Sequence, residues 1–591
     1  MSTKSGRLSR IWKEMKRRNV LRSLAIYAGT AFVILEAATI IFPRWDLPDW
    51  TIDLVLYLLI LGAFITFIVA WIFDITPQGV QVTKPLEEVG ETERPSDSKV
   101  WKAATYISLI VIVALIILNL VPSKQLKAGD IQSLVVLPFD NFTGDDQLDY
   151  FVSGMHASLI GDMGKVEGMR VIGKTSSNTY KNADLTIAEI ATELAVDAVV
   201  ETEVMCLGDT ICLQVRVLTP FPEEKLLWTS DYREEKSQIL GLYNRVTRQI
   251  ANEVRIELSP VEERVLNKSR TVNKEAYDAY LMGLFYWDKL SKEALDKALE
   301  YFNKAVEIDP DWAPPYSGLA QVWVGLAQMG FVAPEIAGPM IFENLNTALE
   351  LDPDLASSYY TQALVSGWIE FNWAKGEQEF LIALELNPND ALSRIFYAHM
   401  LMHLQRKDEA LSQGQQAVDL DPMNPLTLAL YAVVLSYADQ WEEAMENTEK
   451  AISLDPYNYF AHLVLEPVSY NLEDKDGLMK SIRFCQPFEE EVFQSLEKIL
   501  EEEGIKVAYA EFISQLEILG QSSFFVPVHM ANRYSYLNQY DKAMDMLELG
   551  FEVHDQNMPY MASGYGNMDS LYTNPRFLVL MEKLNLPMPK N

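Results

Sequence analysis

The chain has 591 residues, of which 49% are hydrophobic and 22% are charged, and its formal net charge is -34. At roughly 150 residues per domain, this length predicts about four domains, and the composition excludes wholesale disorder. Only three cysteines are present, too few for disulfides to replace a hydrophobic core. Because so acidic a chain repels phosphate groups, we expect no nucleic acid as a partner.

The N-terminal part of the chain departs from this acidic character. Residues 1–22 carry eight lysines and arginines against one acidic residue, Glu14. Three apolar runs of 19 to 22 residues follow, each with at most one charged residue: 23–42, 52–73 and 103–121. A helix rises 1.5 Å per residue, so each run can cross a hydrocarbon core of about 30 Å. The sequence therefore predicts three transmembrane helices that bind the chain to a lipid bilayer.

The distribution of basic residues predicts the orientation of these helices. Basic flanks stay in the cytoplasm, so residues 1–22 and the loop 74–102 are expected there. Everything after Pro122 is then expected outside, which in a Gram-negative cell is the periplasm. We expect a multi-pass protein of the bacterial inner membrane with its bulk in an oxidising compartment that has no ATP pool.

A small α/β domain is predicted at residues 131–258. Within it, apolar runs of strand length alternate with stretches of helical periodicity. The predicted strands are 134–139, 170–173, 197–204, 211–218 and 226–230, and the predicted helices are 150–163, 186–194 and 237–257. This alternation predicts a sheet covered by helices.

Two of the three cysteines, Cys206 and Cys212, flank a turn at Gly208-Asp209 in this domain. With a two-residue turn, Cys206 lies opposite Ile211 and Cys212 points to the other face of the sheet. We therefore favour two buried thiols. A five-residue loop would instead place the cysteines opposite one another and allow a disulfide, so this alternative stays open.

The remainder of the chain contains a sequence repeat. Helix-like segments that end in Asp-Pro or Asn-Pro place prolines at 310, 353, 388, 422 and 456, which are 43, 35, 34 and 34 residues apart. The tetratricopeptide period is 34, and proline ends the second helix of each unit. We predict a repeat array at residues 272–570, clearest at 276–456, with seven or eight helical pairs and a terminal capping segment at 571–591.

Stacked helical pairs curve so that the first helix of each pair lines a concave face. Such grooves usually bind a peptide or a helix of a partner protein. The repeat pattern places the following candidate partner-binding residues in this groove: Leu392, Ile395, His399, Met402, Val433 and Ser436, with Leu426 and Ala429 beside them. The alternative for each residue is that it packs against a neighbouring repeat.

Two motifs suggest catalysis but lack the context that it needs. Residues 168–175 match the phosphate-binding pattern Gly-x4-Gly-Lys-Thr, yet Val171-Ile172 is predicted as strand and Ser176–Thr179 is not a helical start. His399 and His403 lie four residues apart, but Met400 occupies the position where a metalloprotease has its glutamate. We predict no catalytic residue, no cofactor and no metal site.

Several segments resemble a known family. Ser133–Phe142 (SLVVLPFDNF), Tyr150–Met155 and Arg170–Ser176 resemble the TolB-amino-terminal-like domain, and Leu227–Tyr232 is similar to its closing strand. Such domains precede tetratricopeptide repeats in many bacterial signalling and envelope proteins. Residues 15–80 resemble the two-span module that opens some of them. Relatives often carry a cyclase, kinase or winged-helix output domain in front, but with only 22 residues before the first span we expect none here.

The predicted fold class is multi-domain: three transmembrane helices, a small α/β domain and an α-solenoid of tetratricopeptide-like helical pairs. The predicted function is that of a non-catalytic, membrane-anchored scaffold that binds a partner protein on the periplasmic side. One alternative is a signal transducer that relays periplasmic binding to a separate cytoplasmic output protein. The other is an enzyme with an unrecognised active site, although the sequence has no cluster of acid-base groups.

Overall fold

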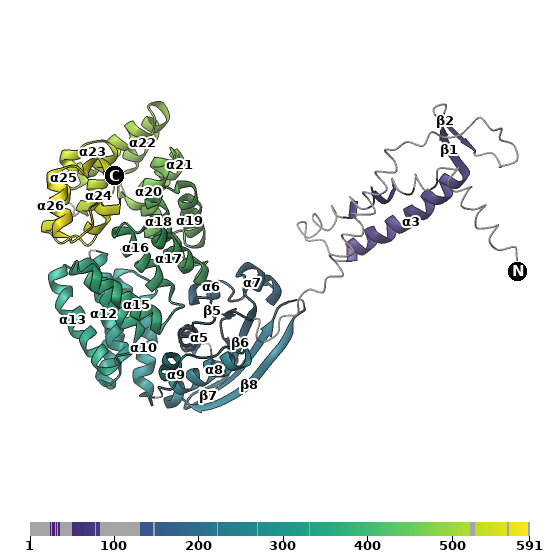
Figure 1. Cartoon of the computed structure of the whole chain (residues 1–591), viewed down its shortest axis with the longest axis horizontal. Coiled ribbons are helices and arrows are strands. Elements are labelled where there is room, and N and C mark those ends of the chain that lie inside the picture. The colour runs from purple at the N-terminus through teal and green to yellow at the C-terminus, as the bar shows by residue number, and fades with distance from the viewer. Residues whose placement is uncertain are drawn as a thin grey trace. The chain divides into compact units, whose positions relative to one another are not determined.

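The computed structural model forms two compact units, residues 1–123 and 124–591, which are described separately (Figure 1). It describes residues 50–76, 79–82 and 131–588, without 146–147, 222, 269, 330, 521–525 and 564–566, and a few isolated positions before Trp50. The predicted spans 103–121 and, except for isolated positions, 23–42 lie outside the described residues.

In the first unit, helix α3 (Trp50–Ile72) covers the second predicted span, and a hairpin of β1 (Phe73–Thr76) and β2 (Gly79–Val82) follows it. Large apolar side chains are exposed along α3: Tyr57, Leu58, Leu61, Phe64 and Ile65. Within the described part of the chain, no helix has both the length and the hydropathy of a membrane span. The hairpin lies where the sequence predicted only a loop.

The second unit opens with the α/β domain, whose mixed sheet has the order β5-β3-β6-β7-β8. β3 runs parallel to β5 and β6, β4 pairs parallel with β6, and β6, β7 and β8 are antiparallel. The strands are β3 (Ser133–Val136), β4 (Asp140–Asn141), β5 (Arg170–Val171), β6 (Ala198–Leu207), β7 (Thr210–Thr219) and β8 (Lys225–Glu235). The helices are α5 (Asp149–Met163), α6 (Lys174–Asn178), α7 (Ile187–Glu193), the 3-10 helix η4 (Lys236–Gln238), α8 (Ile239–Glu253) and α9 (Pro260–Leu266).

Side chains alternate along these strands, which gives the sheet two different faces. Val200, Val215 and Val217 point to the face covered by α5 and α8 and are fully buried there. Val135 and Val199 point to the other face, where α7 packs over them. The predicted strands and helices of this domain are thus present, although several bounds differ, and β4 and α6 are additions.

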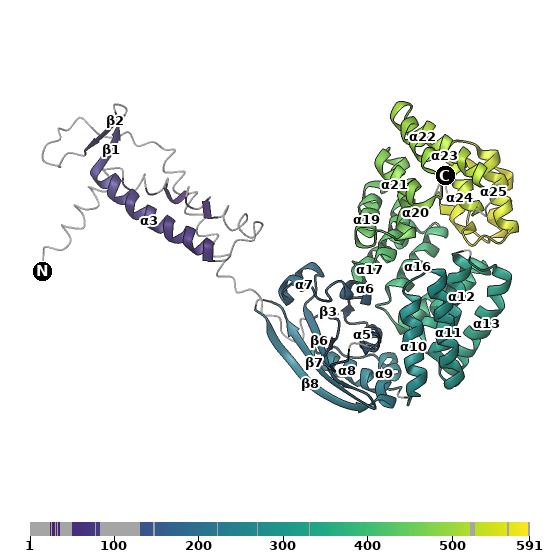
Figure 2. The same cartoon turned by 180° about the vertical axis from the view of Figure 1, so that it is seen from behind.

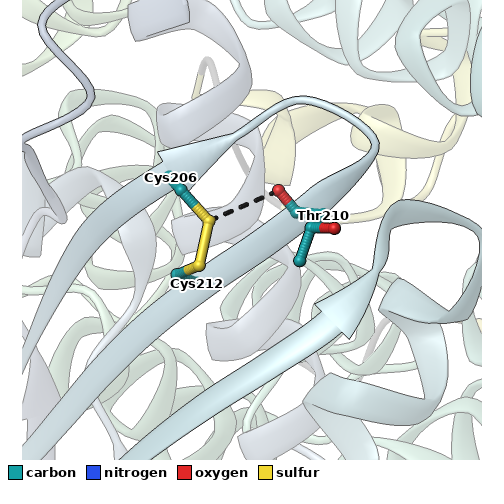
Figure 3. The surroundings of a disulfide bond; sticks show 3 residues. All are labelled: Cys206, Thr210 and Cys212. Carbon is teal, nitrogen blue, oxygen red and sulfur yellow. Dashed lines mark hydrogen bonds between the residues drawn. A yellow bond between two sulfur atoms is a disulfide. The ribbon is translucent and has the colours of Figure 1, made fainter.

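A disulfide joins Cys206 to Cys212 at the β6–β7 turn (Figure 3). Cys206 lies opposite Cys212, and Leu207 lies opposite Ile211, because the pairing shifts at a bulge between Val204 and Cys206. The extra residue moves Cys206 to the face of Cys212, since a shift of one residue reverses the side of every later side chain. The favoured prediction of two thiols is therefore wrong. The disulfide forms through this bulge, and not through the five-residue loop on which the alternative depended, because Leu207 and Ile211 remain paired.

The repeat array follows as eight antiparallel helical pairs in the described residues (Figures 1 and 2). The first helices of the pairs are α10 (Lys274–Trp287), α12 (Ala313–Gln328), α14 (Ala356–Leu364), α16 (Ala391–His403), α18 (Pro425–Tyr437), α20 (Tyr459–Asn471), α22 (Glu490–Glu502) and α24 (Pro527–Tyr536). The second helices are α11 (Lys292–Ile308), α13 (Pro334–Leu351), α15 (Trp373–Leu386), α17 (Lys407–Leu420), α19 (Trp441–Leu454), α21 (Lys475–Cys485), α23 (Ile505–Gly520) and α25 (Tyr540–Glu552). The π-helix η5 (Val365–Ile369) continues α14, and η6 (Met558–Ser563), η7 (Met568–Leu571) and α26 (Pro575–Lys583) end the chain.

The five predicted Asp-Pro and Asn-Pro turns each end a second helix, as proline requires. Four of these turns, residues 309–312, 352–355, 387–390 and 421–424, form what we call the docking row. They contact the α/β domain and the α9 segment after it: Arg270 with Asp309, Lys268 with Asp352, Arg264 with Asp354, Asn389 with Val171, and Asp421 with Ser176. The fifth turn, residues 455–458, makes no such contact among the described residues and exposes Tyr457.

The contact at Asp421 also bears on whether the motif at residues 168–175 can bind a phosphate group. A short helix, α6, does begin at Lys174, so the prediction that no helix starts there is wrong. However, its first turn already binds the array: the N–H of Ser176 donates to Oδ1 of Asp421 at 2.8 Å, and the N–H of Gly173 donates to the carbonyl of Leu420 at 2.7 Å. The carboxylate of Asp421 takes the place that a phosphate would need.

Candidate functional site: a concave pocket in the repeat array

A pocket with a volume of about 110 Å³ lies where the first helices α16, α18 and α20 face α24 and η6. Its surface is mostly apolar. The residues that line it are His399, Leu430, Val433, Phe460, Leu463, Val464, Glu466, Pro467, Tyr509, Val528, His529, Asn532, Arg533, Tyr536, Asn557 and Tyr560. The pocket thus lies on the side of the array where the sequence predicted a binding groove.

The structure separates the predicted groove residues into two groups. His399 and Val433 line the pocket. Ile395 and Met402 are fully buried between helices, and Leu392 packs against the same core. Ser436 is also buried, and its hydroxyl donates to the carbonyl of Ala432 one turn earlier in α18. Partner binding stays a prediction for this set, of which His399 and Val433 line this pocket.

His399 is held by two hydrogen bonds. Its Nε2 lies 2.9 Å from the carbonyl of Leu430, and its Nδ1 lies 2.8 Å from the hydroxyl of Tyr560. Since a neutral imidazole has one N–H, Nε2 donates to the carbonyl and Nδ1 accepts from Tyr560. Burial lowers the pKa of His399 to about 4, so the ring is neutral near pH 7.

His403, one turn along α16, is surrounded by aromatic rings. The centroids of Trp368, Trp373 and Tyr560 lie 5.5, 5.9 and 4.5 Å from its own. Neither ring nitrogen has a hydrogen-bond partner in the described part of the chain, and burial holds its pKa well below the usual value. The rings of His399 and His403 therefore both lie against the ring of Tyr560. Among the described residues, no three His, Cys, Asp or Glu side chains lie close enough to hold a metal ion.

Tyr560 belongs to a C-terminal segment (residues 556–586) that packs back onto the middle of the array. The indole N–H of Trp373 donates to the carbonyl of Leu584 at 2.8 Å, and the side chain of Gln405 donates to the carbonyl of Ala562. Helix α26 lies within the predicted capping segment 571–591. Part of the concave face is thus occupied by the chain's own C-terminal segment, and the pocket is the part that stays open beside it.

A buried ion pair forms one wall of the pocket. Nε and Nη2 of Arg533 donate to the two carboxylate oxygens of Glu466 at 2.8 and 2.7 Å, and the hydroxyl of Tyr509 donates to Oε1 at 2.8 Å. Glu466 is 4% exposed and Arg533 is 8% exposed. Burial alone would raise the pKa of Glu466, but the guanidinium of Arg533 lowers it below its usual value. This pair was not predicted from the sequence, where its only signal is a glutamate inside the apolar stretch 460–468.

Helix α24 presents polar side chains to the pocket at helical spacing: His529, Asn532, Arg533 and Tyr536. Oδ1 of Asn532 has no hydrogen-bond partner in the part of the chain that the structure describes, although this residue is 7% exposed. Burial, followed by the positive charge of Arg533, lowers the pKa of His529 to about 4. The pocket therefore offers neutral donors and acceptors on an apolar surface.

The low pKa of His399 makes stability depend on pH. An unfolded histidine titrates near pH 6.5. Below that pH the unfolded chain therefore binds a proton at this residue, whereas folded His399 stays neutral until the pH falls to about 4. The stabilisation is fully present above about pH 6.5 and is lost as the pH falls toward 4, at about 1.4 kcal/mol per pH unit. His399→Gln should reduce the slope of the unfolding free energy against pH by this amount, measured by denaturant titrations between pH 4.5 and 6.5.

The matched control for this change is Tyr560→Phe. It removes the hydroxyl that donates to His399 but leaves the imidazole buried, so it should lower stability without removing the pH slope. An unchanged slope in His399→Gln would contradict the assignment of a buried neutral ring.

Comparison with known proteins agrees with the repeat pattern. A tetratricopeptide repeat profile matches residues 280–311. Putative adenylate cyclase 3 of Rhizobium meliloti (strain 1021) is 31% identical over 202 residues, which cover 34% of this chain and 33% of that protein. This chain therefore spans about a third of the length of that relative. The chain contains tetratricopeptide repeats behind a small α/β domain and is distantly related, over part of its length, to a putative cyclase.

Three solved structures are similar to segments of this chain. Pseudomonas aeruginosa pilF is 20% identical, with 38% of this chain and 97% of that chain covered and a TM-score of 0.28. PilW, a type IV pilus biogenesis factor, is 15% identical, with coverages of 38% and 99% and a TM-score of 0.30. A monomeric mutant of IFIT1 is 15% identical, with coverages of 59% and 79% and a TM-score of 0.35.

Proposed function

We propose that this chain is a membrane-anchored, non-catalytic interaction protein whose repeat array binds a segment of a partner protein in the concave pocket. The observation that carries the proposal is the pocket itself. It lies on the inner side of a tetratricopeptide array, a fold that suggests protein-protein interaction, and its lining is apolar with neutral hydrogen-bonding groups.

The chemistry of the lining supports a peptide as the occupant. A dry cavity of 150 Å³ is known to hold benzene, so a volume of about 110 Å³ suits one apolar side chain. The unpartnered Oδ1 of Asn532 can accept from a backbone N–H of the bound segment. Because the charge of Arg533 is already neutralised by Glu466, the pocket has no free charge to select a charged side chain.

Three observations support anchoring, with the array outside the cytoplasm. The apolar runs at 23–42, 52–73 and 103–121 follow a basic segment, and α3 exposes large apolar side chains as a lipid-facing helix would. The Cys206–Cys212 disulfide suits an oxidising compartment such as the periplasm. A C-terminal alkaline phosphatase fusion should be active in a Gram-negative host, whereas an inactive phosphatase together with an active cytoplasmic reporter would overturn this orientation.

The pocket is tested by site-specific photocrosslinking of the full chain in membranes. A photoreactive phenylalanine at Leu463, which is half-buried in the pocket lining, should crosslink one discrete protein. The same probe at Leu381, which is exposed on α15 and outside the pocket lining, should not. Leu463→Arg should abolish capture of that protein, and Leu381→Arg should retain it. Equal crosslinking from both positions would contradict the proposal.

A second candidate is a signal transducer that relays binding at the array to a cytoplasmic output protein. The partial likeness to a putative adenylate cyclase favours it, as does the docking row, because it joins the array directly to the α/β domain. A cytoplasmic protein that crosslinks to residues 1–22 only when the pocket is occupied would support this function over a passive scaffold.

A further inference from the structure

The α/β domain has one long open edge. Strand β8 has 11 residues, whereas strands usually have five or six, and in the described residues it pairs with β7 alone. Figures 1 and 2 both show β8 at the outer rim of the sheet. The array contacts of Gly173 and Ser176 lie near the opposite end of the sheet, beside β5, and so leave this edge open.

Natural proteins usually shorten, bulge or cover such an edge, because its free N–H and C=O groups can pair with another strand. The one irregularity of β8 lies near its start, between Leu226 and Trp228. From Trp228 to Glu235 the strand pairs with β7 without a further shift. No hydrogen bond from the described residues reaches the outer edge of this stretch, so eight consecutive residues are available for pairing.

The exposed face of this stretch carries Thr229, Asp231, Arg233 and Glu235. One carboxylate oxygen of Asp231 accepts from the side chain of Gln214, and the other has no hydrogen bond among the described residues. Arg233 forms no ion pair within the described part of the chain. An unpaired carboxylate oxygen and an unpaired guanidinium therefore lie two residues apart on one face.

These charges and the length of the overlap together favour one register for pairing with a second copy. In an antiparallel two-fold pair, opposed residues share a face, so the symmetric centre falls on a single residue. A centre at Asp231 opposes two aspartates, and a centre at Arg233 opposes two arginines. A centre at Tyr232 instead places Asp231 of each copy opposite Arg233 of the other. A centre at Glu234 would oppose Arg233 with Glu235 of the other copy, but it would pair only residues 233–235 of the strand.

We propose that two copies of this chain associate through antiparallel pairing of their β8 strands, centred on Tyr232. The two sheets then continue into one another, and two Asp231–Arg233 pairs fix the register. On the other face of β8, the hydroxyl of Tyr232 donates to Gln249 of α8, and Glu234 forms an ion pair with Arg245 of α8. These two side chains are therefore already partnered within the same copy. The partner is thus another copy of the chain, and the proposal is independent of the pocket.

The test is a charge exchange in the full chain, purified in detergent and examined by sedimentation equilibrium. Asp231→Arg and Arg233→Asp should each raise the dimer dissociation constant about tenfold or more, because two attractive cross-strand pairs become repulsive. The double variant D231R/R233D restores opposite charges in the same register and should return the dissociation constant to near the wild-type value. Both side chains are exposed, so each variant is expected to fold, which circular dichroism checks.

Gln214→Ala is the matched control. It removes the hydrogen bond to Asp231 without changing any charge and should leave the dimer unchanged. A monomeric wild-type chain would overturn the proposal. A dimer that is insensitive to the single reversals would also overturn it, because the interface would then lie elsewhere.

Discussion

Replacing Arg533 with methionine is expected to lower the free energy of unfolding by about 3–5 kcal/mol. The change leaves the carboxylate of Glu466 buried beside the pocket, with the hydroxyl of Tyr509 as its one remaining hydrogen-bond partner among the described residues. An uncompensated buried charge is far more costly than the loss of the attraction itself. Denaturant unfolding of the full chain in detergent, followed by the circular dichroism of the helices, measures the loss.

The double variant Glu466→Leu/Arg533→Met distinguishes this cause from a simple loss of packing. It removes both charges and keeps apolar volume at the site, so it should recover most of the stability that Arg533→Met loses. A double variant as unstable as the sum of the two single variants would contradict the assignment, because the charges would then not be coupled.

Replacing Asp421 with alanine is expected to release the α/β domain from the array. Ser176 is fully buried, and its N–H and hydroxyl both donate to Asp421, so both lose their acceptor in a buried interface. Each buried donor left unpaired costs about 1–3 kcal/mol, and the interface should weaken by about 2–4 kcal/mol. Hydrogen exchange should therefore accelerate in residues 164–178 and 387–424, while the β6–β8 hairpins stay protected.

Asp455→Ala is the control, because Asp455 occupies the same position one repeat later. Its carboxylate accepts from the N–H of Tyr457 within its own turn, and no contact with the α/β domain is present among the described residues. This variant should leave exchange in residues 164–178 unchanged. Equal acceleration in both variants would show that the effect is a loss of turn stability and not of docking.

The repeat array could be predicted because its signals are local. Each second helix ends before an Asp-Pro or Asn-Pro pair, and the alanines at 305, 348, 383, 417 and 451 are all buried where neighbouring helices approach. The strands of the α/β domain could also be predicted from the sequence, since their apolar runs have the length of a strand. The prediction that Cys206 lies opposite Ile211 was wrong because of one bulged residue after Val204. The alternation of apolar and polar residues in a sequence does not reveal such a register shift.

The candidate site could be predicted only in part, because it depends on contacts between distant segments. His399 and Tyr560 are 161 residues apart in sequence, and Glu466 and Arg533 are 67 apart. The repeat pattern placed His399 and Val433 on the inner side of the array. It could not show that a C-terminal segment returns to contact Trp373, His399 and Gln405 or that α24 completes the pocket.

The docking row limits how this protein can change in length. Repeat arrays usually tolerate the gain or loss of a unit, because each repeat touches only its neighbours. Here Asp352, Asn389 and Asp421 contact Lys268, Val171 and Ser176, respectively. A repeat inserted or deleted before Asp421 would move these turns away from their partners. A unit inserted or deleted beyond Asp421 would in turn move the C-terminal segment away from Trp373 and His399. The number of repeats is therefore constrained on both sides of Asp421.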